Sequence, residues 1–199
     1  MPLQIVLASS SPIRSQLLTN ADINHESISP QIDEESVKMS MLSEKFLHRE
    51  IPDALADMKA RKVNLKRPRN YVLGCDQVLS FEGKLYSKPK SKLDLEKQLQ
   101  EMSGKTHKLI SAAVIYKDMK PKWRHVNSAK LSMRVLSDYD VKKYVDRNWE
   151  SVNYCTGGYE IDRKGAHLFE KIEGDFFSIL GMPLLEIIGF LKLRGILDT

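Results

Sequence analysis

A group of hydroxyl and guanidinium side chains stands near the start of the chain, in the segment LASSSPIRSQLL (residues 7–18). Ser9, Ser10 and Ser11 follow an apolar run, and Arg14 lies about one turn into the helix-like run that comes next. N–H groups at a helix N-terminus favour an anion, and a guanidinium binds phosphate through two parallel hydrogen bonds. The spacing therefore predicts a phosphate site, with an N-cap serine and ordinary polar loop residues as the alternative.

Two charged residues further along the chain stand in otherwise apolar patterns. Lys59 lies between Leu55 and Val63 at four-residue spacing, where a lysine either extends to solvent or is held toward a negative group. Asp76 follows the strand-like run YVLGC (71–75), and a carboxylate at a strand end suits a metal ligand or a general base. An aspartate that caps a turn is the alternative for Asp76.

The serine-rich segment joins a predicted strand to a predicted helix. The continuous apolar run 3–8 indicates a strand buried on both faces, and Ser11 with Pro12 indicates the N-cap and first residue of a helix. Such a junction lies at the carboxyl end of a sheet, where open α/β sheets bind their ligands.

The rest of the chain alternates strand-like and helix-like patterns, without internal repeats. Strands are predicted over 25–30, 71–81, 108–116, 123–135 and 167–172, with a hairpin joining 108–116 to 123–135. Further helices are predicted over 52–65, 91–102, 137–149 and 184–194, with capping pairs Ser91/Asp94 and Ser137/Asp140 and a C-cap at Gly195. This order predicts a mixed α/β fold, in which helices flank one curved central sheet and two lobes surround a cleft, as a single domain over residues 1–199.

The composition limits the class of protein. With 42% hydrophobic and 29% charged residues, the chain has the composition of an ordinary globular protein. Two cysteines without a CxxC motif exclude a disulfide framework, disfavour structural zinc and favour a reducing compartment, the cytoplasm. No signal peptide is expected at the start, and Pro183 and Glu186 interrupt the apolar run 176–191, so it is predicted to be a buried helix with a preceding turn rather than a membrane span.

A net charge of +5 favours an anionic partner without identifying it. A nucleic-acid-binding module would use the dense basic run at 59–69, but the chain has no aromatic–basic interleaving and no helix-turn-helix pattern. Catalysis by Cys75 is also disfavoured, because adjacent residues of a strand point to opposite faces and Asp76 follows at once. The expected partner is a small nucleotide, with no nucleic acid and no membrane, and a homodimer is left open.

Several motifs in order along the chain resemble those of the Maf family of nucleoside triphosphate pyrophosphatases. The matching segments are LASSSPIRSQLL, DEE (33–35), KAR (59–61), GCDQV (74–78), SKP (87–89), SGKTHKLISAAVIY (103–116) and the glycine-rich stretch from 157 to the GMPL ending at 184. The resemblance covers nearly the whole chain and implies a fold of the Maf and ITPase type.

The resemblance implies hydrolysis between the α and β phosphates of a nucleoside triphosphate, with a divalent cation such as Mg²⁺ or Mn²⁺. The products would be a nucleoside monophosphate and pyrophosphate. Carried over by position, the phosphate-binding residues are Ser9, Ser11, Arg14, Lys59 and Lys88. Asp76 corresponds to the proton acceptor, Glu34 and Asp76 to metal ligands, and Gln77 and Asp162 lie on the base or sugar side. Whether Asp76 acts as base or as metal ligand is left open.

The chain departs from the family pattern at two positions. Ile13 replaces the first of two paired arginines, and Asp162 stands where Glu or Gln is usual, in a loop expected to shape the base pocket. The DQV motif and the C-x-G at 155–157 resemble the branch that acts on 7-methyl-GTP more than the branch that prefers dTTP and UTP. Tyr159 and Glu160 could contact a methylated base, with a purely structural tyrosine as the alternative. A non-catalytic protein of cell-division control is the remaining alternative.

Overall fold

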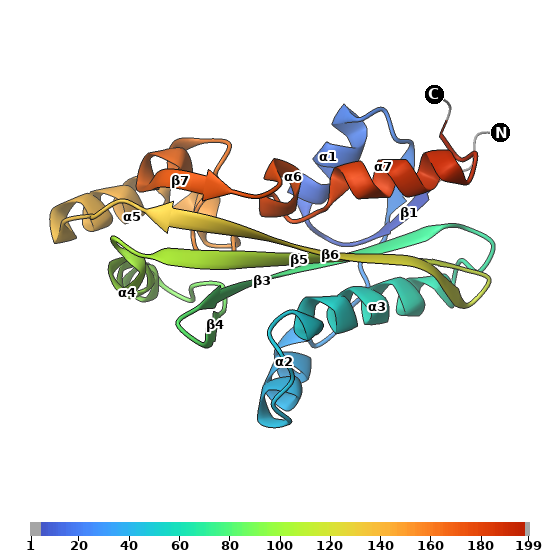
Figure 1. Ribbon diagram of the computed structural model, residues 1–199, viewed down its shortest axis with the longest axis horizontal. Coiled ribbons are helices and arrows are strands. Elements are labelled where there is room, and N and C mark those ends of the chain that lie inside the picture. Colours follow the sequence, from blue (N-terminus) through green and yellow to red (C-terminus); the bar gives the residue numbers. More distant parts are fainter. Residues whose placement is uncertain (1–4, 198–199) are drawn as a thin grey trace. The chain divides into compact units, whose positions relative to one another are not determined.

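The computed structural model describes residues 5–197, which form two compact units of mixed strands and helices (Figure 1). The first unit contains the chain up to 77, residues 110–127 and the chain from 175 onward. The second unit contains residues 78–109 and 128–174. Strands β3 (Val72–Phe81), β5 (Thr106–Lys117) and β6 (Lys120–Met133) each contribute residues to both units.

The sheet of the first unit has the strand order β2-β1-β3-β5-β6. Strand β1 (Ile5–Ala8) pairs in parallel with both β2 (His25–Ser27) and β3. The hairpin between β5 and β6 turns at Asp118 and Met119, whose φ angles of 52° and 61° suit the mirror-image turn that matches strand twist. The predicted strand before the serines, buried on both faces, and the predicted hairpin are both confirmed, while residues 3 and 4 of the predicted first strand lie outside the described residues.

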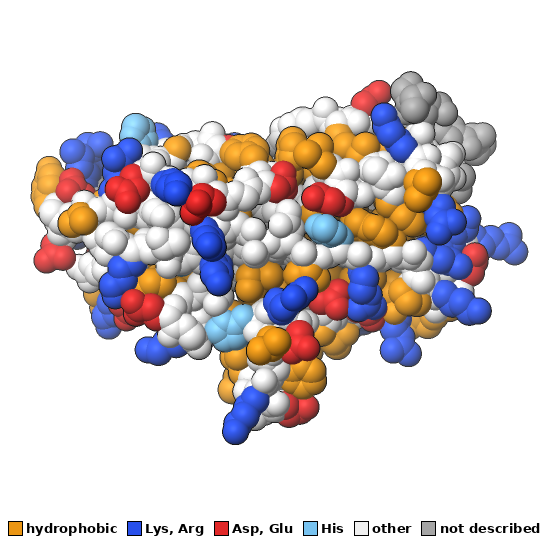
Figure 2. Space-filling model, viewed as in Figure 1, with side chains coloured by type: hydrophobic (Ala, Val, Ile, Leu, Met, Phe, Trp, Pro, Cys, Tyr) orange, Lys and Arg blue, Asp and Glu red, His pale blue; other side chains and the backbone are white. Residues whose placement is uncertain are grey.

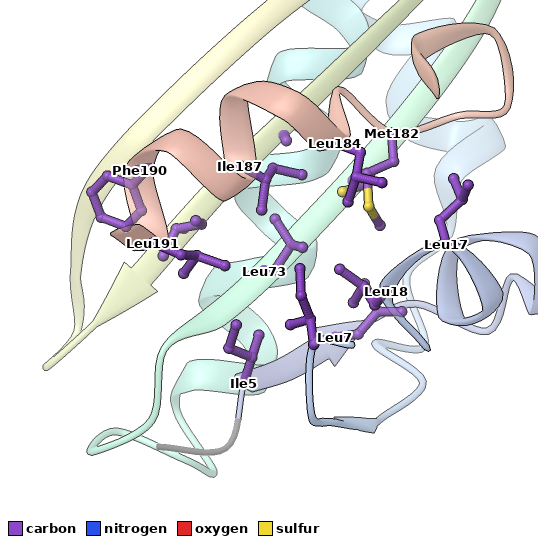
Figure 3. Close-up of a cluster of buried hydrophobic side chains, with 14 residues drawn as sticks. Ile5, Leu7, Leu17, Leu18, Leu73, Met182, Leu184, Ile187, Phe190 and Leu191 are labelled. Atoms are coloured by element: carbon purple, nitrogen blue, oxygen red, sulfur yellow. The ribbon is translucent and has the colours of Figure 1, made fainter. Parts of the chain in front are cut away.

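Helices cover both faces of this sheet (Figure 1). One face carries α1 (Pro12–Asn20) and α7 (Leu184–Leu193), which pack on alternate strand residues such as Ile5, Leu7 and Leu73 (Figure 3). The other face carries α3 (Glu50–Asn64), which packs on Val6, Ala8 and other small side chains. Burying each large aliphatic side chain contributes about 1.5–3 kcal/mol, so this two-sided core holds β1 and β3 in place.

Gly74 allows α3 to approach β3 closely. A Cβ atom at this position would lie 2.2 Å from the backbone oxygen of Ala56 and 2.7 Å from the backbone nitrogen of Ala60. Only glycine fits there, and this close packing fixes the position of α3 relative to the next residues of β3.

The second unit combines the other strand segments with the helices α4 (Lys92–Met102) and α5 (Asp138–Val152). Strand β4 (Lys84–Tyr86) pairs antiparallel with β3, and β7 (Phe169–Glu173) pairs antiparallel with β6. The predicted capping box at Ser137 and Asp140 is present. The capping box predicted at Ser91 and Asp94, at the start of α4, is only half formed. The backbone N–H of Asp94 donates to the Ser91 hydroxyl, but the Asp94 carboxylate accepts from the backbone N–H of Lys90 instead of that of Ser91.

Several predicted element boundaries are displaced by up to three residues. The strand expected from residue 167 begins at Phe169, because Lys164–Leu168 form a 3-10 helix, η1. The buried helix predicted in the apolar run 176–191 is α7, which begins at Leu184 as expected, and the segment before it contains a short helix, α6 (Phe176–Ile179), and Gly181 at a φ of 104°. Helix α2 (Glu34–Ser43) completes the first unit. No helix in residues 5–197 has both the length and the apolar character to cross a membrane.

The predicted fold class is confirmed. Within the described residues, seven strands form one sheet with parallel and antiparallel pairs, and helices flank it.

Candidate active site

The loop between β1 and α1 carries the predicted phosphate-binding serines. Ser9 is buried, and its hydroxyl oxygen accepts hydrogen bonds from the backbone N–H of Ser11 at 3.2 Å and from Arg14 at 3.3 Å. Ser11 occupies the N-cap position of α1, yet its side chain makes no capping hydrogen bond. Ser9 therefore shapes the loop, while the Ser11 hydroxyl is not used in capping and can serve a ligand.

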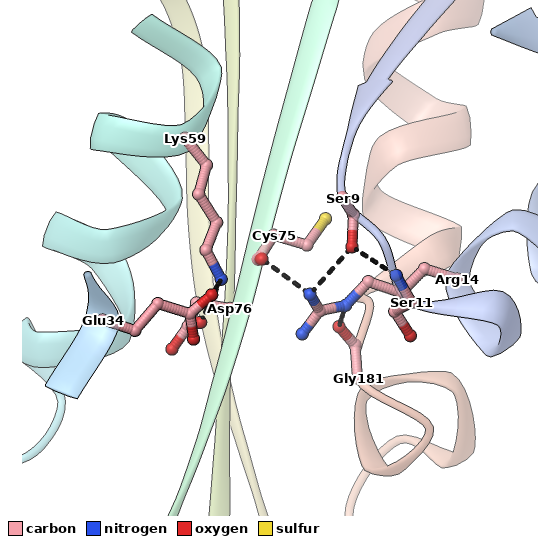
Figure 4. A network of polar contacts seen from close by, with 8 residues as sticks. All are labelled: Ser9, Ser11, Arg14, Glu34, Lys59, Cys75, Asp76 and Gly181. Carbon is pink, nitrogen blue, oxygen red and sulfur yellow. Dashed lines mark hydrogen bonds and ion pairs between the residues drawn. The ribbon is translucent and has the colours of Figure 1, made fainter. Parts of the chain in front are cut away.

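Arg14 joins three separate segments of the first unit (Figure 4). Its Nε donates to the carbonyl oxygen of Gly181 at 2.9 Å, and its Nη1 donates to that of Cys75 at 2.8 Å as well as to Ser9. A guanidinium has five N–H donors, and Nη2 donates none of its hydrogens to a described residue. The side chain is thus fixed in position while keeping donors for a phosphate oxygen.

Lys59 lies between two carboxylates. Its Nζ is 2.6 Å from Oδ1 of Asp76 and 2.7 Å from Oε1 of Glu34, at the start of α2 (Figure 4). Lys59 is only 3% exposed and Asp76 only 2%. Of the two alternatives for this lysine, the structure shows the second: the ammonium is held toward negative groups and does not extend to solvent.

The charges in this cluster do not balance within the protein. Burial acts to raise the pKa of Glu34, but the charge and hydrogen bond of Lys59, with smaller effects from Lys38 and Arg14, bring the pKa below its ordinary value. Two carboxylates therefore face a single ammonium. The second carboxylate oxygen of Asp76, Oδ2, is buried and has no hydrogen-bond partner among residues 5–197. A buried acceptor without a partner is costly, so this oxygen is suited to a ligand, a cation or a reacting water.

The residues present fit a divalent cation that shares its ligands with a substrate. Glu34 and Asp76 offer carboxylate oxygens, and Mg²⁺ is commonly held by one or two carboxylates together with substrate phosphates and water. Within residues 5–197, no group of three or more His, Cys, Asp or Glu side chains is arranged to hold a metal. A cation here would need ligands beyond the protein.

The amide nitrogen of Gln77 forms hydrogen bonds with residues of the first unit. Nε2 lies 3.0 Å from the hydroxyl of Ser111 and 2.9 Å from the carbonyl oxygens of both Ser178 and Ile179. The hydroxyl of Ser111 also donates to the Ser178 carbonyl at 2.6 Å. A contact of Gln77 with a base or sugar would therefore fall to its amide oxygen.

Lys88 and Asp162 belong to the second unit, whereas the other predicted site residues belong to the first. Both lie close enough to Cys155 for their charges to affect its thiol. Burial is the main cause that raises the pKa of Cys155 to about 12, with Lys88 opposing the rise and Asp162 adding to it. The predicted roles of Lys88 on phosphate and of Asp162 on the base stay predictions.

Tyr159 is a core residue of the second unit. It is 5% exposed, its hydroxyl oxygen lies 2.6 Å from Nε2 of His107, and its ring meets Phe169 edge-on at 4.7 Å. Burial lowers the pKa of His107 to about 4, so this histidine is neutral at pH 7. The structural alternative for Tyr159 is therefore the one observed. Glu160 accepts a hydrogen bond from the hydroxyl of Tyr154.

Cys75 is not a nucleophile. Its side chain is fully buried in the apolar cluster on the α7 side of the sheet, and burial raises the pKa of its thiol to about 11. The side chain of the next residue, Asp76, contacts Lys59 from α3 on the other side. The sequence argument against cysteine catalysis is confirmed.

Sequence reasoning missed two residues that hold this site together, Ser111 and Gly181. Ser111 lies inside an apolar strand run and carried no signal of its own. Gly181, beside Pro183, could have been recognised as a turn residue from the Gly-x-Pro pattern.

Comparison with known proteins identifies the relatives of this chain. The sequence pattern of the family described as Maf-like protein matches residues 4–194. The chain belongs to the Maf family. This membership confirms the predicted family and, with it, the predicted enzyme class, a hydrolase.

Individual relatives agree with this assignment. A Ruegeria pomeroyi protein named nucleoside triphosphate pyrophosphatase is 51% identical over 199 residues, covering 100% of both chains. A Brucella abortus protein named 7-methyl-GTP pyrophosphatase is 39% identical over 198 residues, again with 100% coverage of both. A solved Mycobacterium abscessus nucleoside-triphosphatase (dITP/XTP pyrophosphatase) shares 16% identity at a TM-score of 0.35, covering 66% of this chain and 73% of that one. At that TM-score the likeness supports no argument about this Maf protein.

Proposed function

We propose that this Maf protein hydrolyses a nucleoside triphosphate between the α and β phosphates, releasing the monophosphate and pyrophosphate. The observation that carries the proposal is the pairing of two functions on consecutive residues. The carbonyl oxygen of Cys75 fixes the guanidinium of Arg14, and the side chain of Asp76 contacts Lys59. A phosphate-binding cation and an activated carboxylate are thereby attached to one rigid stretch of β3.

The phosphate chain would be held mainly by groups of the β1–α1 loop. Three kinds of donor there suit phosphate oxygens: the unused N–H groups of Arg14, the hydroxyl of Ser11 and the first N–H groups of α1. We propose that Lys88 adds a further positive charge to the binding of the phosphate chain of the nucleotide. Because a triphosphate carries about four negative charges, several such donors are needed to stabilise the charge that develops during cleavage.

Asp76 is proposed as the proton acceptor for the attacking water. Lys59 binds Oδ1 and orients the carboxylate, while Oδ2 has no partner within the described residues and can accept the proton. Glu34 and Asp76 would also hold a divalent cation, Mg²⁺ or Mn²⁺, which when bound neutralises phosphate charge and makes water more acidic.

We favour 7-methyl-GTP as the substrate, with dTTP or UTP as the alternative within the family. The DQV motif at Asp76 and Gln77 supports this choice, as does the 39% identity to a 7-methyl-GTP pyrophosphatase. Removal of such nucleotides would be a housecleaning reaction of the cytoplasm, a compartment in which the free thiols of Cys75 and Cys155 persist.

A nucleic-acid-binding function has less support. Figure 2 shows Lys and Arg side chains spread over the visible face with Asp and Glu among them, and not gathered into a single basic stripe. A non-catalytic role in cell-division control is also less supported, because the Glu34–Lys59–Asp76 cluster is intact.

The test is pyrophosphate release from a panel of 7-methyl-GTP, dTTP, UTP and GTP, with Mg²⁺, with Mn²⁺ and with chelator. We expect rapid release from one nucleotide, loss of release with chelator, and a fall of about 10³-fold in Asp76→Asn. Asp118→Asn makes the same change on the β5–β6 turn and should leave the rate unchanged. A folded protein that releases pyrophosphate from none of the four nucleotides would favour the non-catalytic alternative.

A further inference from the structure

A cavity of about 680 Å³ lies within the second unit, between the C-terminal half of α5 and the 3-10 helix η1. Such a volume lies in the range of small-molecule sites. We call it the Arg147 pocket. Its lining residues are Tyr144, Arg147, Asn148, Ser151, Val152, Glu160, Arg163, Lys164, Gly165 and His167. All of them belong to the second unit, as do Lys88 and Asp162, whereas Ser9, Arg14, Lys59 and Asp76 belong to the first.

The lining of this pocket is strongly basic. Arg147, Arg163 and Lys164 carry positive charges, His167 adds an imidazole ring, and Glu160 is the single carboxylate among the lining residues. Glu160 already accepts a hydrogen bond from Tyr154 at 3.0 Å, and it lies 3.8 Å from Arg163. Three cations against one carboxylate leave an excess of two positive charges.

Most of these cations lack a counter-ion in the protein. Within residues 5–197, Arg147, Lys164 and His167 form no ion pair, although a carboxylate on the same helix, Asp146, is paired with Lys92 and Lys142. Like charges lining one concavity repel each other, so an anion bound between them is stabilised by all of them.

The backbone beneath the basic side chains is fixed in place. A Cβ atom on the buried Gly165 would lie 2.5 Å from the backbone oxygen of Glu160, so η1 packs directly on the segment before it. On the helix side, Asn148 donates to the carbonyl oxygen of Tyr144 at 2.7 Å, and the Tyr144 hydroxyl donates to that of Gly158 at 3.2 Å. A ligand would therefore meet a preformed frame and order only the side-chain ends.

We propose that the Arg147 pocket binds a small anion with two or more phosphate groups, either inorganic pyrophosphate or the phosphate chain of a nucleotide. Two guanidinium groups from different elements can each bind phosphate oxygens in pairs, and Lys164 adds a point charge. A ligand with at least two negative charges balances the excess charge of the pocket. A concave site of this volume suits a small molecule better than the extended backbone of a nucleic acid.

Hydrogen–deuterium exchange of the full chain with inorganic pyrophosphate, in the presence of chelator, tests this site without relying on catalysis. We expect slower exchange over residues 144–152 and 160–167 of wild-type protein. In Arg147→Ala/Lys164→Ala this protection should disappear, and calorimetry should show binding at that site weakened about tenfold or more. Lys142→Ala/Lys143→Ala removes two positive charges from the same helix outside the pocket and should retain the protection.

Two further ligands distinguish the sources of phosphate. Protection by pyrophosphate supports a free diphosphate, and protection by ATP without protection by pyrophosphate supports a nucleotide chain. Protection by a single-stranded oligonucleotide alone, equal loss in both double variants, or protection by none of the ligands would overturn the proposal. Should Arg147→Ala/Lys164→Ala fail to fold, Lys164→Gln, which changes one exposed side chain, replaces it in the same comparison.

Discussion

Arg14 donates a hydrogen bond from Nε to the carbonyl oxygen of Gly181, 167 positions later in the chain. The distance is 2.9 Å, and the same guanidinium reaches Cys75 at 2.8 Å. The side chain that we propose to bind phosphate is thereby held by backbone atoms before any substrate arrives. Because fixed donors lose little freedom on binding, this arrangement favours tight binding of a charged transition state.

Gly181→Ala should disturb this contact. Gly181 has a φ of 104°, which strains any residue with a side chain, and a new Cβ would lie 3.4 Å from Nε of Arg14. We expect a loss of about 1–3 kcal/mol in the free energy of unfolding and a higher KM for the nucleotide. Gly189→Ala is the matched control, because that glycine lies in α7 with no atom within 4 Å of its Cβ position. Denaturant unfolding and steady-state kinetics measure both effects, and equal destabilisation by the two variants would contradict the prediction.

Lys59→Met should be the most damaging single change in the carboxylate cluster. It leaves Asp76, which is 2% exposed, without its cation, and breaking a buried ion pair from one side costs about 3–5 kcal/mol. Chemical denaturation at neutral pH should show this loss, together with loss of pyrophosphate release. Lys66→Met, just beyond the end of the same helix, removes one charge from an exposed side chain and should change neither property. Unaltered stability in Lys59→Met would mean that the ion pair contributes nothing to folding.

The sequence predicted the elements of this protein better than the contacts between them. The apolar runs of β1 and β3 and the apolar stripe at Leu55 and Val63 are local patterns, so the two-sided core followed from them. The same stripe located Lys59 but not its partners, because Glu34 and Asp76 come from other elements. The start of β7 was predicted at His167 instead of Phe169, because the short 3-10 helix before it leaves no periodic pattern in the sequence.

The stability of the protein should fall in acid partly through Glu34. The pKa of this carboxyl is lowered from its ordinary value of 4.5 in the folded state, so its contribution is present above that value and is lost as the pH falls through the lowered pKa. Unfolding free energies measured by denaturant from neutral pH into acid should therefore decline more steeply in wild-type protein than in Glu34→Gln. Glu150→Gln removes the same charge from an exposed side chain of α5 and should keep the wild-type slope. If the unfolding free energy of Glu34→Gln falls with pH as steeply as that of the wild type, Lys59 does not stabilise the ionised Glu34 carboxylate in the folded protein.

Gln77→Leu should loosen the segment that supports Arg14. The substitution removes the amide donor and leaves Ser111 and the carbonyl oxygens of Ser178 and Ile179 without it, at a cost of about 1–3 kcal/mol in unfolding free energy. Since Ser178 and Ile179 precede Gly181, we expect KM to rise for every nucleotide that the enzyme accepts. If Gln77 also contacts the base through its amide oxygen, the ratio of kcat/KM between 7-methyl-GTP and dTTP will change as well. Gln77→Glu keeps the length of the side chain and its acceptor oxygen, but replaces the amide donor by a second oxygen and adds a negative charge. A rise in KM shared by both variants with an unchanged ratio would therefore assign Gln77 to positioning alone.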